Sequence, residues 1–355
     1  MIRHDKPATY TAFHLFLTHM ISHSIVPWKT KKWIKELLNP KVPSHLENNF
    51  ITISENQSKI LKQSLIKHFF VKELDPWFDN EYLIREEGKK DLNAQLEGRL
   101  NGFRRTIIPW LNEHKALDKA NILEIGCGTG SSSIALAEQG ANVTAIDVES
   151  EHIKVAQTRA GIYDLNINFK SANATEIEDL FPTTNFDYII FFATLEHMTN
   201  DERIEALMSA WKMLRKDAFL CILETPNRLW FHDGHTSHLP FYSWLPDDLA
   251  FLYSKYSPRN GFNNLYRKIN DELMLEFLRR GRGVSFHELD LTIGASSKLN
   301  VIDSLPIYLR KKSVLRRILW KITDESKFES YLFKVGPKIH KGFYQPFLDL
   351  IIKKE

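Results

Sequence analysis

One short segment limits what this 355-residue chain can fold into. Residues 122–125 form the apolar run Ile-Leu-Glu-Ile, which breaks directly into Gly-Cys-Gly-Thr-Gly at 126–130 and then into three serines at 131–133. Glycines lack the Cβ atom that would keep backbone amides away from a ligand, and they adopt positive φ without steric cost. A helix that starts after such a turn presents unpaired N–H groups to that ligand. The segment therefore predicts a strand, a ligand-binding turn and a helix.

The spacing of the glycines argues against a dinucleotide. The dinucleotide fingerprint G-x-G-x-x-G needs a third glycine at position 131, where this chain has Ser131. A second apolar strand at 142–146 ends at Asp147, about twenty residues past Gly126. A carboxylate at the tip of that strand can accept hydrogen bonds from both hydroxyls of a ribose.

Three more predicted strands follow in order. The strand at 166–170 leads to Asn173 and Ala174, the strand at 186–192 leads to Leu-Glu-His-Met at 195–198, and the strand at 218–223 enters Glu-Thr-Pro-Asn-Arg. Buried strands that alternate with helices are typical of a doubly wound parallel sheet. The same apolar runs would also fit a doubly wound enzyme with a different ligand.

The G-x-G-x-G turn with Glu124 two residues before it resembles motif I of the class I S-adenosylmethionine (SAM) methyltransferases. The stretch from Phe186-Asp187 to Leu195-Glu196-His197 resembles the ubiquinone and menaquinone methyltransferase branch, a methyltransferase domain of the 11/23 type. The resemblance covers roughly residues 100–230. It implies SAM as the cofactor and an α/β, seven-stranded, Rossmann-like sheet. It also implies these cofactor-binding residues: Glu124, Gly126, Cys127, Gly128, Gly130, Asp147, Asn173, Ala174 and Phe192.

Two departures from the family pattern concern the cofactor. Asn173 stands where relatives carry an acid that meets the adenine amine, and an amide can both accept from that amine and donate to a ring nitrogen. Ala193 stands where many relatives carry a polar residue, which leaves the methionine end of the cofactor less well specified. In some relatives an upstream arginine holds the cofactor carboxylate, and Arg99 or Arg104 could take that role here. For each of the two, an exposed arginine on an amphipathic helix is the alternative.

The chain divides into three predicted regions. Residues 1–115 are expected to form a helical N-terminal cap, with apolar residues near a 3.6-residue period at 33–38, 58–74 and 91–111. Residues 116–308 are expected to form the cofactor domain, with a lid inserted at about 227–270 and a final pair of strands at 284–293 and 299–305. Residues 309–355 are expected to be a basic helical tail that docks on the domain, mediates a homodimer or contacts a membrane surface.

Candidate catalytic residues gather in the lid. Residues 232–238 hold His232, Asp233, His235 and His238, and histidine titrates near neutral pH, where a carboxylate can fix its tautomer. We expect His235 or His238 to be a general base with Asp233 as its orienting partner, and His197 is a further candidate. The three lid histidines could instead bind zinc, iron or nickel, but Gly234 and Pro240 disfavour a helix that would make them converge, so no metal is assigned. For each histidine alone, a structural role in a buried loop is the alternative.

Composition bounds the remaining choices. Both ends are basic, with seven Lys/Arg against three Asp/Glu in residues 1–50 and twelve against five in residues 309–355, which suits either an anionic partner or solvated helix faces. No signal peptide or membrane-spanning run is apparent, and the only two cysteines fall on predicted buried segments, so we expect a cytoplasmic protein.

The expected function is O-methylation of a small molecule or glycan, with quinone-type lipids as a second substrate class. Adenine N-methylation is disfavoured, because Ala-Thr-Leu-Glu at 193–196 replaces the Asp/Asn-Pro-Pro-aromatic signature, and no nucleic-acid module is recognisable. The alternatives are a SAM-binding scaffold without turnover and a nucleic-acid methyltransferase.

Overall fold

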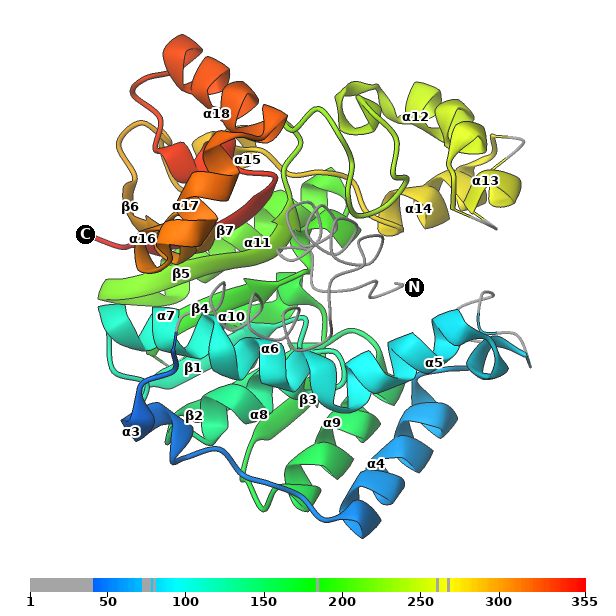
Figure 1. The fold of residues 1–355 in the computed structure, drawn as a ribbon, viewed down its shortest axis with the longest axis vertical. Coiled ribbons are helices and arrows are strands. Elements are labelled where there is room, and N and C mark those ends of the chain that lie inside the picture. The colour runs from blue at the N-terminus through cyan, green and yellow to red at the C-terminus, as the bar shows by residue number, and fades with distance from the viewer. Residues whose placement is uncertain (1–40, 72–77, 79–80, 183–184, 260–261, 267–268) are drawn as a thin grey trace.

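The computed structural model describes residues 41–355 except 72–77, 79–80, 183–184, 260–261 and 267–268. The helix expected at 33–38 lies outside these residues. A central seven-stranded sheet has the order β3-β2-β1-β4-β5-β7-β6, in which β7 alone is antiparallel to β5 and β6 while the other pairs are parallel. The doubly wound, seven-stranded Rossmann-like sheet expected from the sequence is confirmed (Figure 1).

Strands β1 to β6 lie close to predicted strands, because their apolar runs are short and bounded by turn residues, whereas β7 was not predicted. Their bounds are β1 Asn121–Ile125, β2 Asn142–Asp147, β3 Asn168–Ser171, β4 Phe186–Phe192, β5 Leu214–Pro226, β6 Asn300–Ser304 and β7 Phe347–Lys353. Every residue of β4 is buried, as expected for a strand that is covered on both faces.

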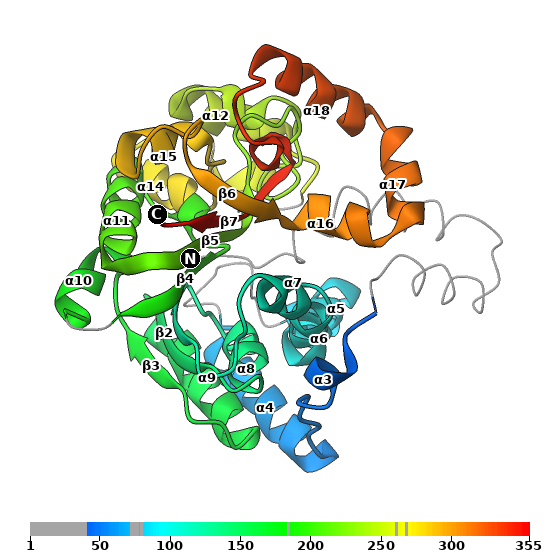
Figure 2. The ribbon, with the colours of Figure 1, turned by 90° about the vertical axis from the view of Figure 1, so that its left-hand side faces the viewer.

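Helices cover both faces of the sheet (Figure 2). One apolar cluster joins the sheet to α6 (Arg99–Arg105), α7 (Ile107–His114), α8 (Ser131–Ala137) and α16 (Leu305–Lys312). A second cluster joins the opposite face to α11 (Asn200–Met213) and α15 (Phe286–Thr292). Among the described residues, none of the helices is long and apolar enough to span a lipid bilayer.

The described part of the N-terminal region, from residue 41 onward, packs largely as helices. It contains α3 (Ser44–Glu47), α4 (Glu55–His68), α5 (Glu86–Asn93), a π-helical segment at Ala94–Gly98, α6 and α7. A separate apolar cluster joins α4 and the segment around Phe78 and Tyr82 to α9 (Ser150–Ile162), the helix after β2. The cap is thereby anchored beside the helix that follows Asp147.

The insertion after β5 has an apolar cluster of its own. It includes α12 (Asp247–Tyr253), α13 (Phe262–Leu265) and α14 (Asp271–Arg279). Tyr242, Phe251 and Phe277 are fully buried in this cluster, whereas Phe241 and Trp244 are about half exposed. Of these lid aromatics, Tyr242 therefore belongs to the buried apolar core of the insertion, and Phe241 and Trp244 lie at the surface.

Two predictions about the end of the sheet were wrong. Residues 284–293 are not a strand, because Ser285 and Glu288 form a capping box that starts α15 at Phe286. The partner of β6 is instead β7, which lies inside the tail that was expected to be helical. Residues 305–335 are indeed helical, as α16, α17 (Val314–Lys321) and α18 (Asp324–Val335), but the apolar run at 347–352 enters the sheet between β5 and β6.

Candidate active site

The glycine turn after β1 has the backbone that its sequence predicts. Gly126, Gly128 and Gly130 all have positive φ, at +81°, +51° and +79°. The amides of Gly126 and Cys127 both donate to the carbonyl of Ile146 on β2, which ties the turn to the neighbouring strand. A Cβ atom on Gly126 would lie 1.8 Å from the Thr194 hydroxyl, so only glycine fits between the ends of β1 and β4.

Asp147 connects the turn to the tip of β2. Its Oδ2 accepts a hydrogen bond from the Gly128 amide at 2.8 Å, and its Oδ1 accepts one from the Glu149 amide at 2.9 Å. Burial alone raises the pKa of this carboxyl, but the nearby His152 ring and the two amides more than offset it, so that its pKa lies below the usual range. A carboxylate has about four acceptor positions; the two amides use two, and the His152 Nδ1 lies 3.4 Å from Oδ1, so at most two remain for a ligand.

A cavity of about 330 Å³ opens at this edge of the sheet, beside the ends of β1, β2, β3 and β4. Its lining includes Gly126, Asp147, Asn173 and Ala174, four of the residues predicted to bind the cofactor. The Asn173 Oδ1 accepts from the Thr175 amide at 3.1 Å and caps a short 3-10 turn, so its Nδ2 is left to face a ligand. The carboxyl ends of strands are where open α/β sheets place their ligands.

Three other predicted cofactor residues lie around the turn rather than in this cavity. The Glu124 carboxyl is fully buried and accepts from the hydroxyls of Ser132 and Ser133, and burial raises its pKa to about 7. Gly130 precedes α8 and packs against Ala156 of α9, where an added Cβ would lie 2.9 Å from the Ala156 Cβ. Cys127 is buried beside the turn, and burial raises the pKa of its thiol.

A second, smaller recess of about 10 Å³ shares Gly126 and includes Cys127, Gly128, Phe192 and Arg99. The Arg99 guanidinium faces the Glu224 carboxyl at 3.5 Å. The other predicted arginine, Arg104, lies elsewhere and donates two hydrogen bonds of 2.7 Å to Glu138. Of the two, Arg99 is the one that lines a recess beside the glycine turn.

The lid residues that were predicted to act as general base and orienting carboxylate do not form a pair. Asp233 is buried, and its carboxylate accepts from the amides of His235, Thr236 and Ser237, so it shapes the loop rather than orienting an imidazole. His238 is exposed and has a left-handed backbone with φ of +56°. His232 is also exposed and lines a different cavity of about 300 Å³, and His235 is buried, so the three lid histidines do not converge.

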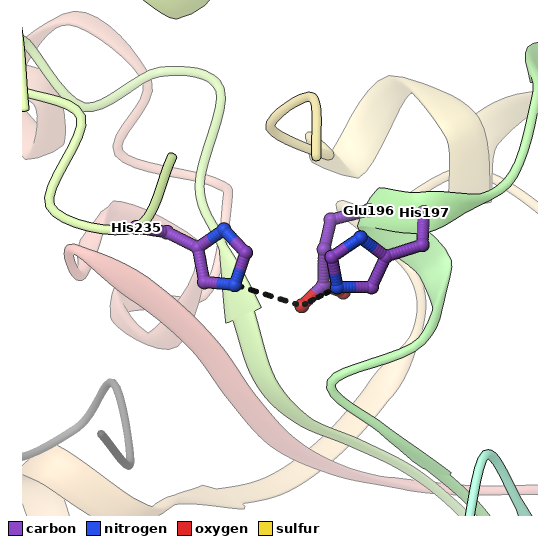
Figure 3. A group of neighbouring side chains, drawn as sticks. All are labelled: Glu196, His197 and His235. Atoms are coloured by element: carbon purple, nitrogen blue, oxygen red, sulfur yellow. Dashed lines mark ion pairs between the residues drawn. The ribbon is translucent and has the colours of Figure 1, made fainter. Parts of the chain in front are cut away.

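His235 instead meets two residues that follow β4. Its Nε2 lies 3.9 Å from the Glu196 Oε1, and the His197 Nε2 lies 3.7 Å from the same oxygen (Figure 3). Glu196 is completely buried, and this burial raises its pKa to about 8; burial also lowers the pKa of His235. His197 lines the same cavity as Gly126 and Asp147, so the histidine cluster adjoins the glycine turn.

Two strained backbone conformations and one contact near the site were not predicted from the sequence. Ala193 after β4 and Glu224 within β5 adopt positive φ, at +46° and +53°, close to Gly126 after β1. Such strained residues cluster at ligand sites. Nothing in the residue types of Ala193 and Glu224 signals this backbone. Glu196 was part of the Leu-Glu-His motif, but it had no assigned role, because the sequence does not show that His235 approaches it.

Comparisons with known proteins agree with this geometry. Residues 122–217 match a family model described as a methyltransferase domain. The ubiquinone biosynthesis O-methyltransferase of Rickettsia akari is 32% identical over 142 residues, which cover 39% of this chain and 54% of that protein. A putative methyltransferase of Geobacillus is 31% identical over 101 residues, which cover 28% of this chain and 40% of that protein.

Solved structures are more distant. The structure of magnesium protoporphyrin IX methyltransferase from Synechocystis with bound SAM is 19% identical, with a TM-score of 0.35 over 52% of this chain and 83% of that one. The chain spans about half the length of the curated relatives it matches. The glycine turn, the acid at the tip of β2 and the matched family model together show that residues 122–217 are similar to a methyltransferase domain.

Proposed function

We propose that the protein transfers the methyl group of SAM to a hydroxyl oxygen of a small molecule. One observation carries the proposal: His197, a residue able to take a proton, lines the same cavity as the Gly126 turn and Asp147. In this proposal Asp147 binds the ribose hydroxyls, Asn173 and Ala174 meet the adenine, and Arg99 holds the methionine carboxylate. Quinone-type lipids are one acceptor class to test, because relatives are named ubiquinone biosynthesis O-methyltransferases.

Methyl transfer to a hydroxyl requires alignment of the acceptor oxygen, the methyl carbon and the sulfur, and one group that accepts the hydroxyl proton. The acceptor oxygen attacks the methyl carbon, the carbon–sulfur bond breaks, and its electron pair stays on sulfur, which gives S-adenosylhomocysteine. The hydroxyl proton passes to an imidazole. The His197 Nδ1 lies 2.9 Å from the Arg279 carbonyl oxygen, which can only accept, so Nδ1 carries the hydrogen and Nε2 of the neutral ring has the lone pair.

His235 supports the same role from the lid. Its lowered pKa keeps the ring neutral near pH 7, and its Nε2 faces the Glu196 carboxyl beside His197. The structure therefore favours His197 and His235 over His238 as the proton acceptor. His238, which is exposed, serves as the matched control in the experiment.

The test is a labelled-methyl assay with a panel of catechols, quinols, glycans and RNA. We expect transfer to a hydroxyl acceptor, a loss of at least about a hundredfold in kcat for His197→Ala, consistent with removal of a general base, and near wild-type rates for His238→Ala. SAM binding by calorimetry should survive His197→Ala. Binding of SAM without transfer to any acceptor would favour the scaffold alternative, and equal rates for all variants would refute the histidine role.

A further inference from the structure

We propose that Glu196, His197 and His235 form a binding site for a divalent transition-metal cation such as Zn²⁺ or Fe²⁺. The side chains come from two distant segments, the end of β4 and the lid loop, and offer two imidazole nitrogens and one carboxylate (Figure 3). Two histidines and one glutamate are the ligand set of many catalytic metal sites that leave a position open for a substrate.

The hydrogen bonds of the two rings fix which nitrogen faces the carboxylate. The His197 Nδ1 donates to the Arg279 carbonyl oxygen at 2.9 Å. The His235 Nδ1 lies 2.9 Å from the Thr236 hydroxyl, which itself donates to the Gly281 carbonyl, so the ring must be the donor in this pair. Both Nε2 atoms of the neutral rings therefore present lone pairs toward Glu196. Second partners of this kind orient the histidines of metal sites.

The Glu196 carboxyl lies near both rings without a direct hydrogen bond to either. The His197 and His235 Nε2 atoms lie 3.7 and 3.9 Å from the Glu196 Oε1, beyond hydrogen-bond distance. By distance and angle, neither carboxyl oxygen of Glu196 accepts a hydrogen bond from a residue in the described part of the chain. Buried polar atoms are almost always paired, and a cation held together with the two imidazoles would pair the buried Glu196 carboxyl.

The separations suit a site that closes slightly on binding. Donor atoms about 2.1 Å from a tetrahedral cation lie about 3.4 Å apart. The two distances to Glu196 exceed this by less than about 0.6 Å, and all three donor atoms lie within 4.8 Å of one another. Because His197 also lines the cavity beside the glycine turn, an open coordination position would face an acceptor bound there.

The catalytic consequence rests on the proposed function, but metal binding does not. In the loaded protein both Nε2 lone pairs are committed to the cation, so activation of the acceptor hydroxyl passes from an imidazole to the cation, which lowers the pKa of a bound oxygen. The Glu202–Arg279 ion pair, at 2.6 Å, lies at the same cavity, and the backbone carbonyl of Arg279 accepts from His197.

The test is a calorimetric titration of chelator-treated full-length protein with Zn²⁺. We expect one tight site per chain in the wild type, a loss of at least about a hundredfold in affinity for Glu196→Gln and His235→Ala, and a loss of about 10- to 100-fold for Thr236→Val, which removes only the second partner of His235. His232→Ala, three residues away and exposed, should bind Zn²⁺ like the wild type. Melting curves and SAM binding of each variant verify that it is folded.

The outcomes separate this site from the proposed function. Equal Zn²⁺ affinity for the wild type and folded Glu196→Gln, or no Zn²⁺ binding by the wild type, would overturn the metal site even if methyl transfer proceeds with chelator present. Tight Zn²⁺ binding that depends on Glu196 would support the site even if no acceptor is methylated.

Discussion

The replacement Asp147→Asn tests how the carboxylate at the tip of β2 works. Its two oxygens accept from the amides of Gly128 and Glu149, at 2.8 and 2.9 Å, and the remaining acceptor positions face the cavity. In either orientation the asparagine amide group would point its NH₂ at one of these backbone donors. The substitution therefore removes the charge that the ribose hydroxyls would meet and also disturbs the glycine turn.

The magnitude follows from the hydrogen bonds that are lost. Hydrogen bonds to a charged group contribute about 1.5–3 kcal/mol each, so losing the charge from two ribose contacts is expected to cost about 3 kcal/mol of binding free energy. This corresponds to SAM affinity lower by about a hundredfold. Because the pKa of Asp147 lies below the usual range, the loss should be the same from pH 6 to pH 8.

Calorimetry with SAM and S-adenosylhomocysteine measures this change. Glu149→Gln is the matched control, since Glu149 is an acid that lines the same cavity, yet it contacts Asp147 only through its backbone amide. We expect its affinity to stay within about threefold of the wild type, well below 1 kcal/mol. A folded Asp147→Asn protein that binds SAM as tightly as the wild type would refute the role of this carboxylate.

Three further predictions follow from the same site. Arg99→Met should weaken SAM by about tenfold or more through loss of a charge-assisted contact, while methylthioadenosine, which lacks the amino-acid carboxylate, should bind unchanged in calorimetry. Gly130→Ala should lower the free energy of unfolding by about 1–3 kcal/mol in urea titrations, because φ is +79° and the new Cβ would meet Ala156; unchanged stability would contradict the packing. Asp349 is buried, accepts from the Glu224 amide at 2.7 Å, and has a pKa raised to about 8 by burial. Its protonated form is favoured by folding, so its contribution to stability is full below about pH 4 and is lost as pH rises toward 8. Asp349→Asn should remove that slope and gain up to about 5 kcal/mol over the wild type at pH 9 in urea unfolding, and parallel pH profiles would contradict this.

Local sequence signals were enough for the part of the fold that binds the cofactor. Strands β1 to β5 are short apolar runs between turn residues, and the turn at 126–130 is dictated by glycine, so both could be located without the structure. The shared cavity of Asp147 and Asn173 could then be predicted, because parallel strands end at the same edge of a sheet.

The remainder depends on contacts between distant residues. The run at 347–352 gives no sign that it inserts between β5 and β6, since its partners lie more than 40 residues away. The helix at 286–292 was recognisable from Ser285 and Glu288, a capping signal that the apolar pattern concealed. His235 could not be paired with Glu196 because the lid loop that joins them has no periodic pattern. The bounds of the lid and of the three regions stay predictions. The same holds for a homodimer or membrane contact through the tail.

The most direct test of the central claim is a crystal structure with S-adenosylhomocysteine. The account predicts that the ligand lies in the cavity beside the glycine turn, with its ribose hydroxyls on the Asp147 carboxylate, its adenine beside Asn173 and its amino-acid carboxylate toward Arg99. A ligand bound elsewhere, or a cavity that prefers a nicotinamide dinucleotide, would contradict it.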